Sequence, residues 1–464
     1  MAEVAGAGTV IVGAGPAGLL LAHLLLQAQP KPHLLPVRVF EARNDPRTPL
    51  PQYKERQYCV GLSARGQDGI KRVPGLWEEV EKRGMPSSQF VLHSGKRAIA
   101  LKRNPGKPSL LINQRALAAT LVTELVNRYP KDHLEVHFDT PCERVDFKTR
   151  TASFNGKSVD SVPYNLLVGA DGARSAVRNE FITQRGFDYQ QTNMPYTFKV
   201  LYVPRPAELS EEAVHAFRVT KEDAIEENGK QSSWFKLPFS GTAEKTSLRF
   251  SCFPTPGNGM SVLIEWSPGT TPVELLSIKS AEELKAYMEK YMPPLKVPLE
   301  AAEAFINQRP TSSMKVFCSR FHDAGGKAVL IGDAAHAMSN ALGQGCNSSL
   351  QDVVTLSQSL CEEDDLTKAL ERYTKKQTQE DHAASYLSEF SFPQAKWVLP
   401  FFYLGNIAQP ALGKVLPPSI LAPPIQSLCS ETLTPYSEIV RIHKRWLSFV
   451  EITNKMAASK GPSS

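Results

Sequence analysis

The pattern of hydrophobic and polar residues changes twice along the chain and predicts three kinds of structure. In the first part, continuous apolar runs over Thr9–Val12 and Val37–Phe40 predict buried parallel strands, with a helix over Gly18–Ala28 between them. QRALAATLVTELVNR at 114–128 has apolar residues at helical spacing, Thr151–Ser161 has the pattern of a hairpin, and YNLLVGADG contains a third buried strand.

From about Phe187 to Ile306 apolar and polar residues alternate, as in TSLRFSCF and MSVLIEW, with Pro, Gly and Ser between the segments. This pattern predicts an antiparallel sheet. KAVLIGDAAHA returns to the buried-strand pattern, and beyond about Asp365 the spacing is helical, with SEIVRIHKRWLSFVEI expected to form one amphipathic helix. The fold class is therefore α/β, with an inserted antiparallel sheet and a C-terminal helical region.

Composition excludes some classes of function. The net charge of +6 on 464 residues is small and the basic residues are dispersed, so we expect no nucleic-acid partner. The seven cysteines show no CxxC or metal-type spacing, and no secretory signal is recognised, so we expect reduced thiols, no metal and a cytoplasmic protein. Six prolines interrupt the apolar stretch 397–425, which predicts packed helices and no spanning helix; a peripheral membrane contact is the alternative.

GAGPAG follows the first strand and opens a helix, which is the setting of a dinucleotide-binding loop. Gly13 would allow the tight turn, Gly15 would let a diphosphate approach the backbone, and Gly18 would allow close packing of helix and strand. Pro16 and Ala17 complete the loop at the helix N-terminus, where amide groups favour phosphate. Glu41, at the end of the second strand, suits an adenosine ribose and repels a 2′-phosphate, so this site suits FAD or NAD(H).

Two further motifs follow at the ends of buried strands. LLVGADGARSAVR places Asp171 after a strand, where it is either a ligand residue or a helix cap. GDAAHAMSNALGQGCN places Gly332 and Asp333 at the carboxyl end of another strand, with Gly343 and Gly345 before a helix. Ligands of open α/β sheets bind at strand carboxyl ends.

A GxGxxG loop with its strand-end glutamate, a DG motif and a GD motif in this order resemble the class A flavoprotein monooxygenases. The segments EARNDPR, RGFDYQQ, VFCSRFH and EDHAASYLS resemble the kynurenine 3-monooxygenase branch, and the resemblance covers about 1–450. It implies a Rossmann-type FAD-binding domain over 1–75, 105–186 and 306–365 and a substrate domain over 76–104 and 187–305. A C-terminal helical region over 366–464 would end in a disordered tail from about 457.

The resemblance also implies roles for individual residues. Glu41 would bind the adenosine ribose, Arg115 the flavin diphosphate or ribityl region, Asp171 FAD and NAD(P)H, and Asp333 the ribityl chain. Arg43 would be either a cofactor contact or a surface arginine. Further cofactor contacts would come from the glycine loop, the GD loop and the helix that follows it, namely Gly13, Gly15, Pro16, Ala17, Gly18, Gly332, Gly345, Cys346 and Asn347. Gly343 and Asn340 would lie at the reactive C4a face of the flavin.

The chain departs from its relatives at the substrate side. Asn340 stands where the family has a proline, and GMPSSQFVLHSG contains no arginine, although the kynurenine enzymes hold their substrate with one there. Leu101 and Phe390 replace tyrosines of those enzymes, and we expect both to contact substrate. Kynurenine is therefore not transferred as substrate, and a less polar or larger ligand is expected. We expect a structural role for His336.

The expected activity is a monooxygenase that consumes NAD(P)H and O₂ and hydroxylates a small, aromatic or hydrophobic molecule through a flavin C4a-hydroperoxide. The flavin would supply the chemistry while the protein positions substrate and excludes water. Two alternatives stay open: a flavin-dependent reductase or oxidase without oxygen transfer, which the Asn340 departure suggests, and a non-catalytic flavin-binding protein.

Overall fold

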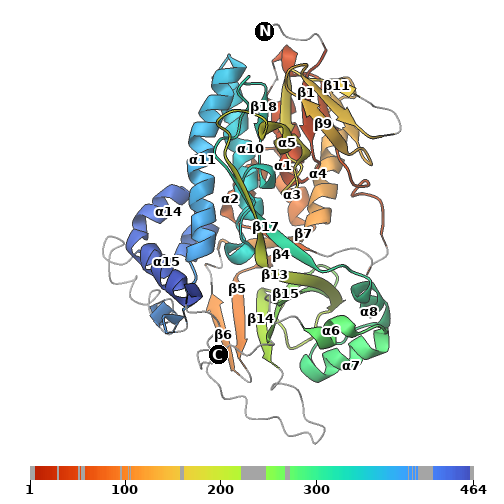
Figure 1. The fold of residues 1–464 in the computed structure, drawn as a ribbon. Helices are drawn as coiled ribbons and strands as arrows, with labels where there is room; N and C mark the ends of the chain where they lie inside the picture. Colours follow the sequence, from red (N-terminus) through yellow and green to blue (C-terminus); the bar gives the residue numbers. More distant parts are fainter. Residues whose placement is uncertain are drawn as a thin grey trace, which may run out of the picture.

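A computed structural model describes most of the chain: 6–28, 31–50, 53, 58–94, 97–102, 104, 106–156, 161–220, 247–266, 272–395, 397–399, 401–402, 404–405 and 422–459. Figure 1 shows a parallel sheet with its helices in the upper half, a large second sheet below it, and the C-terminal helices at one side. The two predicted sheets are therefore separate bodies, joined by long strands and by the loops between them.

The upper sheet contains five parallel strands in the order β18-β12-β1-β2-β8. Their bounds are β1 Thr9–Val12, β2 Val37–Phe40, β8 Leu134–His137, β12 Leu166–Gly169 and β18 Ala328–Leu330. Every residue of β1, β12 and β18 is buried, which explains the continuous apolar runs in their sequences.

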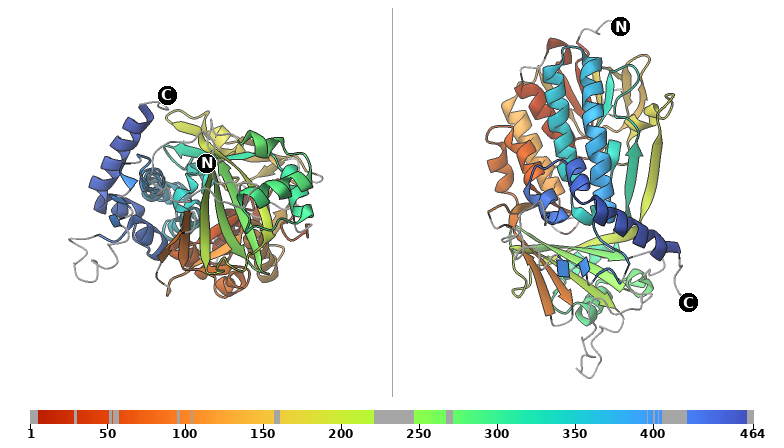
Figure 2. Two further views of the ribbon diagram at one scale, coloured as in Figure 1. Left: turned by 90° about the horizontal axis from the view of Figure 1, so that it is seen from below. Right: turned by 90° about the vertical axis from the view of Figure 1, so that its left-hand side faces the viewer.

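Helices form a layer against this sheet. Helix α10 packs against α1, α2 and α11, and α1 also packs against α4 (Figure 2). The bounds are α1 Pro16–Gln27, α2 Ala64–Lys71, α3 Leu76–Glu81, α4 Gln114–Arg128, α5 Ala176–Phe181, α10 Gly345–Glu362 and α11 Leu366–Phe390. A three-stranded antiparallel sheet, β9 Cys142–Asp146, β10 Thr151–Phe154 and β11 Ser161–Pro163, packs Phe154 on Phe40 of β2 with ring centroids 4.0 Å apart.

The lower sheet has seven strands in the order β17-β13-β16-β15-β14-β5-β6, antiparallel except for the pair β14 and β5. The bounds are β5 Gln89–Ser94, β6 Arg97–Lys102, β13 Tyr189–Pro204, β14 Ala213–Thr220, β15 Ser247–Thr255, β16 Gly259–Trp266 and β17 Thr311–Cys318. Helices α6 Val273–Ser277, α7 Ala281–Tyr291 and α8 Leu299–Ile306 cover one face, in a core that contains Phe250, Val262 and Leu284.

The remaining elements connect these bodies. A small antiparallel sheet contains β3 Cys59–Leu62, β4 Met85–Ser87 and β7 Ser109–Asn113. Short helices are η1 Pro32–Leu34, α9 Asp333–His336 and η3 Asn340–Leu342, and the C-terminal helices are α13 Ile425–Glu431, α14 Tyr436–Ile442 and α15 Lys444–Ser459.

Four sequence predictions are corrected in detail. The first helix begins at Pro16, because a proline suits the first helical position, and ends at Gln27. The predicted single amphipathic helix is broken at His443, whose ring hydrogen-bonds the Pro423 carbonyl at 3.0 Å. The tail expected to be disordered from about 457 is helical as far as Ser459. Strand β17, assigned to the FAD-binding domain from the sequence, pairs with β13 in the lower sheet.

The apolar stretch 397–425 falls largely outside the described residues. Within the part of the chain that the structure describes, no helix is long and apolar enough to span a membrane.

Candidate functional site

The loop between β1 and α1 has the shape of a phosphate-binding turn. Gly13 has a φ of +107°, and a Cβ there would lie 2.3 Å from the Ala170 carbonyl oxygen. A Cβ on Gly18 would lie 2.1 Å from the carbonyl oxygen of Gly13, whereas a Cβ on Gly15 would have nothing within 4 Å. Two glycines therefore serve the packing of this turn, and the third leaves backbone open to a ligand.

Glu41 follows β2 and turns its carboxylate toward the same loop. Its Oε2 accepts the Ala14 N–H at 2.8 Å, and its Oε1 accepts the Arg43 N–H at 2.9 Å. Each oxygen keeps lone-pair capacity for a hydroxyl. The Arg43 side chain is exposed.

Arg115, at the start of α4, is engaged with the segment after Glu41. Its Nη2 donates to the carbonyls of Asp45 and Thr48 at 2.9 Å each, and its Nη1 donates to Asn44 at 3.3 Å. The guanidinium thus holds that segment in place, and its predicted contact with the cofactor stays a prediction.

Asp171 of the DG motif has the helix-cap role that the sequence left open, and its contact with a ligand stays a prediction. Its Oδ2 accepts the N–H groups of Ala176 and Val177 at 2.7 and 3.3 Å, as a helix cap does, while its Oδ1 is buried without a hydrogen-bond partner in the described structure. Burial raises the pKa of this carboxyl group. Arg178 connects the motif to the GD loop by donating to the Ala334 carbonyl at 2.7 Å.

The GD motif turns sharply after β18. Gly332 has a φ of +61°, and Asp333 is exposed although the next three residues of α9 are buried. Although solvent can reach the Asp333 side chain, the protein packed around it desolvates the carboxyl group and raises its pKa, and the positive charge of His336 opposes this rise. Burial, with the negative charge of Asp333, raises the pKa of the Cys346 thiol to about 12, so Cys346 is neutral near pH 7.

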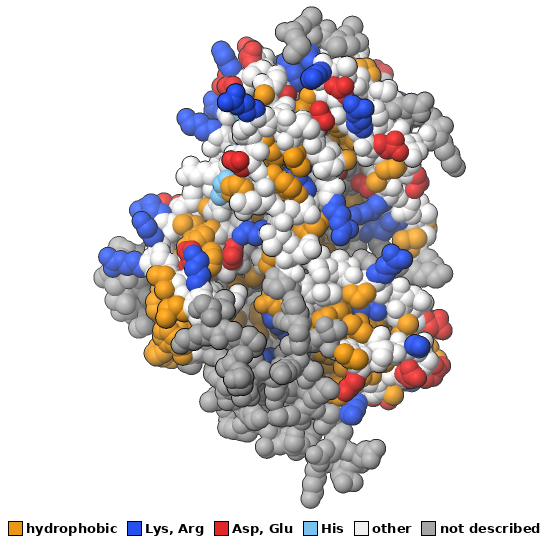
Figure 3. Space-filling view, in the orientation of Figure 1, with side chains coloured by type: hydrophobic (Ala, Val, Ile, Leu, Met, Phe, Trp, Pro, Cys, Tyr) orange, Lys and Arg blue, Asp and Glu red, His pale blue; other side chains and the backbone are white. Residues whose placement is uncertain are grey.

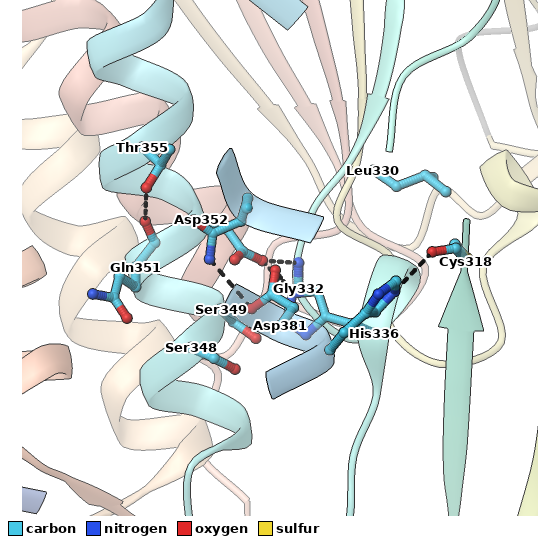
Figure 4. A network of polar contacts seen from close by, with 12 residues as sticks. Cys318, Leu330, Gly332, His336, Ser348, Ser349, Gln351, Asp352, Thr355 and Asp381 are labelled. Atoms are coloured by element: carbon cyan, nitrogen blue, oxygen red, sulfur yellow. Dashed lines mark hydrogen bonds and ion pairs between the residues drawn. The ribbon is translucent and has the colours of Figure 1, made fainter. Parts of the chain in front are cut away.

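Behind the GD loop lies a buried cluster of His336, Asp352 and Asp381 (Figure 4). Asp352 Oδ2 accepts from His336 Nε2 at 2.5 Å and from the Gly332 N–H at 2.7 Å, while Asp381 lies 3.3 Å from the same imidazole nitrogen. Burial by itself lowers the pKa of His336, but the two aspartates outweigh it and raise the pKa to about 10. Burial beside Asp352 raises the pKa of Asp381 far above its ordinary value.

This cluster is therefore an imidazole with a raised pKa held against two buried carboxyl groups, and the pKa of one of them, Asp381, is raised by burial beside the other. It is the one group of metal-type ligands found close together among the described residues, and its short contacts are those of a hydrogen-bonded ion pair. His336 is 2% exposed, which agrees with the structural role expected from the sequence.

In the GQGCN segment the side chain of Asn347 makes structural hydrogen bonds, whereas the backbone of the neighbouring glycines is left open. Asn347 Oδ1 accepts the Ser63 N–H at 2.8 Å, and its Nδ2 donates to the Gly61 and Gly343 carbonyls at 2.9 and 3.0 Å. The side chain thus ties the loop to β3. A Cβ added to Gly343 or Gly345 would meet no other atom within 4 Å, so the backbone at both is open to a flat ligand.

Asn340 joins the GD loop to the lower sheet. Its Nδ2 donates to Glu265 Oε1 on β16 at 3.5 Å. Tyr58 lies at the same junction: burial raises its pKa to about 12, with smaller contributions from Asp333 and Glu265, and its ring centroid is 6.2 Å from that of Phe198 on β13. The expected flavin loop and the sheet thus meet at a polar and aromatic junction.

The two predicted substrate residues belong to different elements, β6 and α11. Leu101 pairs with Phe90 across β6 and β5, near one edge of the lower sheet. Phe390, at the end of α11, packs against a cluster that contains Met338 and Leu342 of the GD loop. Their contact with substrate stays a prediction.

The sequence interpretation missed several polar residues that the fold brings to the site. Asp352 and Asp381 interrupt the apolar faces of long helices, which is a signal for a buried charge. Glu265 and Arg249 occupy polar positions in strongly alternating strands, and only the pairing of those strands places them together.

Comparison with known proteins agrees with these motifs. Residues 7–384 match the family described as FAD binding domain. The chain belongs to this FAD-binding monooxygenase family. Kynurenine 3-monooxygenases are among its relatives: that of Drosophila willistoni is 26% identical over 448 residues (94% of this chain and 90% of the relative) and that of Salinispora tropica is 27% identical over 452 residues (94% and 90%).

Solved structures of two oxygenases share the fold. A tetrameric 2-methyl-3-hydroxypyridine-5-carboxylic acid oxygenase superposes with a TM-score of 0.64 at 18% identity, covering 92% of this chain and 96% of its own. The p-nitrophenol 4-monooxygenase of Pseudomonas putida gives a TM-score of 0.58 at 17% identity, covering 96% and 98%. FAD is the cofactor of this family, and its enzymes are oxidoreductases.

Proposed function

We propose that this protein is an NAD(P)H-consuming, FAD-dependent monooxygenase that hydroxylates a small organic molecule, aromatic or hydrophobic in character. The balanced reaction converts substrate, O₂, NAD(P)H and a proton into hydroxylated substrate, water and NAD(P)⁺. FAD, when bound, supplies the redox chemistry by passing electrons from the nicotinamide to O₂. The chain's own residues bind and orient the reactants and exclude water.

The contact between Asn340 and Glu265 is the observation that carries this proposal. It places the loop that follows Asp333 directly against the polar face of the lower sheet. A substrate bound between this loop and the sheet would lie beside the flavin and be shielded by protein on both sides. A protein that only bound flavin would not need the lower sheet to cover the other side of a substrate site.

The residues present fit FAD. The open backbone at Gly15 and the α1 N-terminus suit the diphosphate, and Glu41 suits the ribose. Asp333, exposed at a strand end, suits the ribityl chain, and Gly345 leaves room for the ring. The orphaned Oδ1 of Asp171 is a further acceptor for a ligand hydroxyl.

Asn340 supports a second candidate, a reductase or oxidase on the same fold. Asn340 stands where the family has a proline, and its amide is a polar group at the expected flavin face. In that case NAD(P)H would be oxidised and O₂ would leave as hydrogen peroxide, with no oxygen transferred to substrate.

Isotope labelling separates the two. The FAD-loaded protein is mixed with NADH or NADPH and candidate aromatic compounds under ¹⁸O₂, and products are analysed by mass spectrometry. A monooxygenase incorporates one labelled atom per hydroxylated product. If NAD(P)H oxidation yields hydrogen peroxide in equal amount and no labelled product with any compound, the oxidase candidate replaces the proposal.

We also propose a cytoplasmic location and a peripheral membrane contact through 397–425. All seven cysteines are free thiols, which supports a reducing compartment. Trp397, Phe401 and Leu404 are 61, 68 and 66% exposed, and hydrophobic side chains gather over the C-terminal helices in Figure 3. Co-sedimentation with phosphatidylcholine vesicles tests the contact, and protein that stays in the supernatant at all lipid concentrations excludes it.

A further inference from the structure

One side of the seven-stranded sheet faces the FAD-binding domain. Phe250, Val262 and Ile264 point into the core beneath α7 and α8. Because side chains alternate along a strand, Arg249 and Glu265 point the other way, where Glu265 meets Asn340. Arg249 and Glu265 are directly opposite each other on β15 and β16, so they share this side.

A second arginine extends the row. Arg218 on β14 is directly opposite Arg249 on β15 and therefore lies on the same side of the sheet. Like charges directly opposite each other destabilise a sheet. The row from Arg218 through Arg249 to Glu265 contains two positive side chains and one carboxylate, so one positive charge has no counterpart in the row.

Both guanidinium groups have free hydrogen-bond capacity. Arg249 lies 4.5 Å from the ring centroid of Tyr196, in a cation–π contact that orients it without using its N–H donors. Within the described part of the chain, neither Arg218 nor Arg249 has a hydrogen bond or an ion pair, and both side chains are exposed. A planar fork of donors held on an aromatic ring is suited to a carboxylate.

We propose that Arg249, assisted by Arg218, is the substrate-anchoring residue, and that the substrate is an aromatic acid with one net negative charge. This inference rests on the proposed function for the position of the flavin. It replaces the expectation of a less polar ligand: the arginine absent from GMPSSQFVLHSG has a counterpart on a different strand.

The dimensions of the row support a small aromatic acid. Neighbouring strands are about 4.8 Å apart, so Arg249 and Arg218 lie roughly 5 and 10 Å along the sheet from Glu265. The Asn340 contact marks the flavin end of the row at Glu265. A substrate whose carboxylate lies on the arginines would thus point its ring toward Asn340, between the rings of Tyr196 and Phe198.

The test compares acids with their neutral amides. The FAD-loaded protein is titrated with three matched pairs: benzoate and benzamide, 2-aminobenzoate and 2-aminobenzamide, and phenylacetate and phenylacetamide. Binding is followed by the flavin absorbance change and by calorimetry, and turnover by stimulated NAD(P)H oxidation. The variants are Arg249→Gln, Arg249→Lys and Arg218→Gln, with Arg441→Gln as the matched control, because the Arg441 side chain on α14 is 74% exposed.

We expect at least one acid to bind about 10- to 100-fold more tightly than its amide, the range for a hydrogen bond to a charged group. Arg249→Gln should abolish this preference, Arg249→Lys should retain part of it, and Arg441→Gln should leave it unchanged. Amides that bind as well as acids, no binding by any acid, or an unchanged preference in Arg249→Gln would each overturn the proposal.

The two proposals fail separately. If an acid binds through Arg249 but no compound is hydroxylated, the anion site stands and the monooxygenase function fails. If neutral compounds are hydroxylated as well as acids are, the function stands and the anion site fails.

Discussion

The buried cluster behind the GD loop makes a sharp prediction, because two buried aspartates beside the same imidazole should lose different amounts of stability in the same substitution. Asp352 is fully buried and accepts from both the His336 imidazolium and the Gly332 N–H. Asp381 is equally buried, but burial beside Asp352 raises its pKa and so favours its neutral form. An asparagine therefore imitates Asp381 well and Asp352 badly.

The magnitude follows from the contacts. Removing one partner of a buried ion pair costs about 3–5 kcal/mol. In Asp352→Asn the imidazolium keeps Asp381 at 3.3 Å, so we expect the lower end, a loss of about 3 kcal/mol. In Asp381→Asn the amide can still accept from Gln377, which lies 3.2 Å from Oδ1, and donate toward Asp352, so we expect a loss of about 1 kcal/mol or less.

Equilibrium unfolding in urea at pH 7, followed by circular dichroism at one fixed FAD concentration, measures both free energies of unfolding. FAD affinity is measured in parallel, because Asp352 also holds the backbone of Gly332 next to Asp333. Equal losses in the two variants, or a larger loss for Asp381→Asn, would refute the different roles inferred for Asp352 and Asp381.

Three further predictions concern the rest of the site. Gly15→Val should fold normally, because its side chain would meet no protein atom, but it should purify without the yellow flavin, because the side chain would occupy the space expected for the diphosphate. Gly18→Ala should instead lose about 3 kcal/mol or more of stability, because its Cβ clashes with the backbone of Gly13. Urea unfolding measures the stability of each variant, and flavin absorbance measures its bound cofactor. The pKa of His336 is raised from 6.5 to about 10, so the stabilisation from its positive charge is fully present below pH 6.5 and is lost as the pH rises through 10. The difference in unfolding free energy between wild type and Asp352→Asn should therefore decrease over that pH range, and a constant difference would contradict the raised pKa. Cys361 is the exposed thiol, so one cysteine should react fast with a disulfide reagent, and Cys361→Ser should remove that phase.

Local signals were sufficient for much of the fold. The strands Thr9–Val12 and Val37–Phe40 and the helix Gln114–Arg128 agree with the structure to the residue, because a buried parallel strand or a helix with one apolar face leaves a continuous local pattern. The break at His443 was missed because the amphipathic pattern continues across it, and the hydrogen bond of its ring to Pro423 is a tertiary contact that no periodicity reveals.

The polar part of the site was harder to predict for the same physical reason. Arg218, Arg249 and Glu265 come together only through strand pairing, and the register of a strand is a tertiary property. The FAD motifs were easier, since a glycine turn and a strand-end acid are read from adjacent residues. Adjacent residues did not decide the role of Asp171, because one of its oxygens caps a helix and the other has no partner in the described structure.

The side chain of Asn347 has a consequence for how the protein is made. It hydrogen-bonds Ser63 across 284 residues of sequence, and β18, which completes the edge of the parallel sheet, also comes late in the chain. Chains are synthesised from the N-terminus, and contacts between distant residues form slowly. The glycine loop therefore leaves the ribosome long before its partners, so a nascent chain cannot capture FAD until most of the protein has been translated.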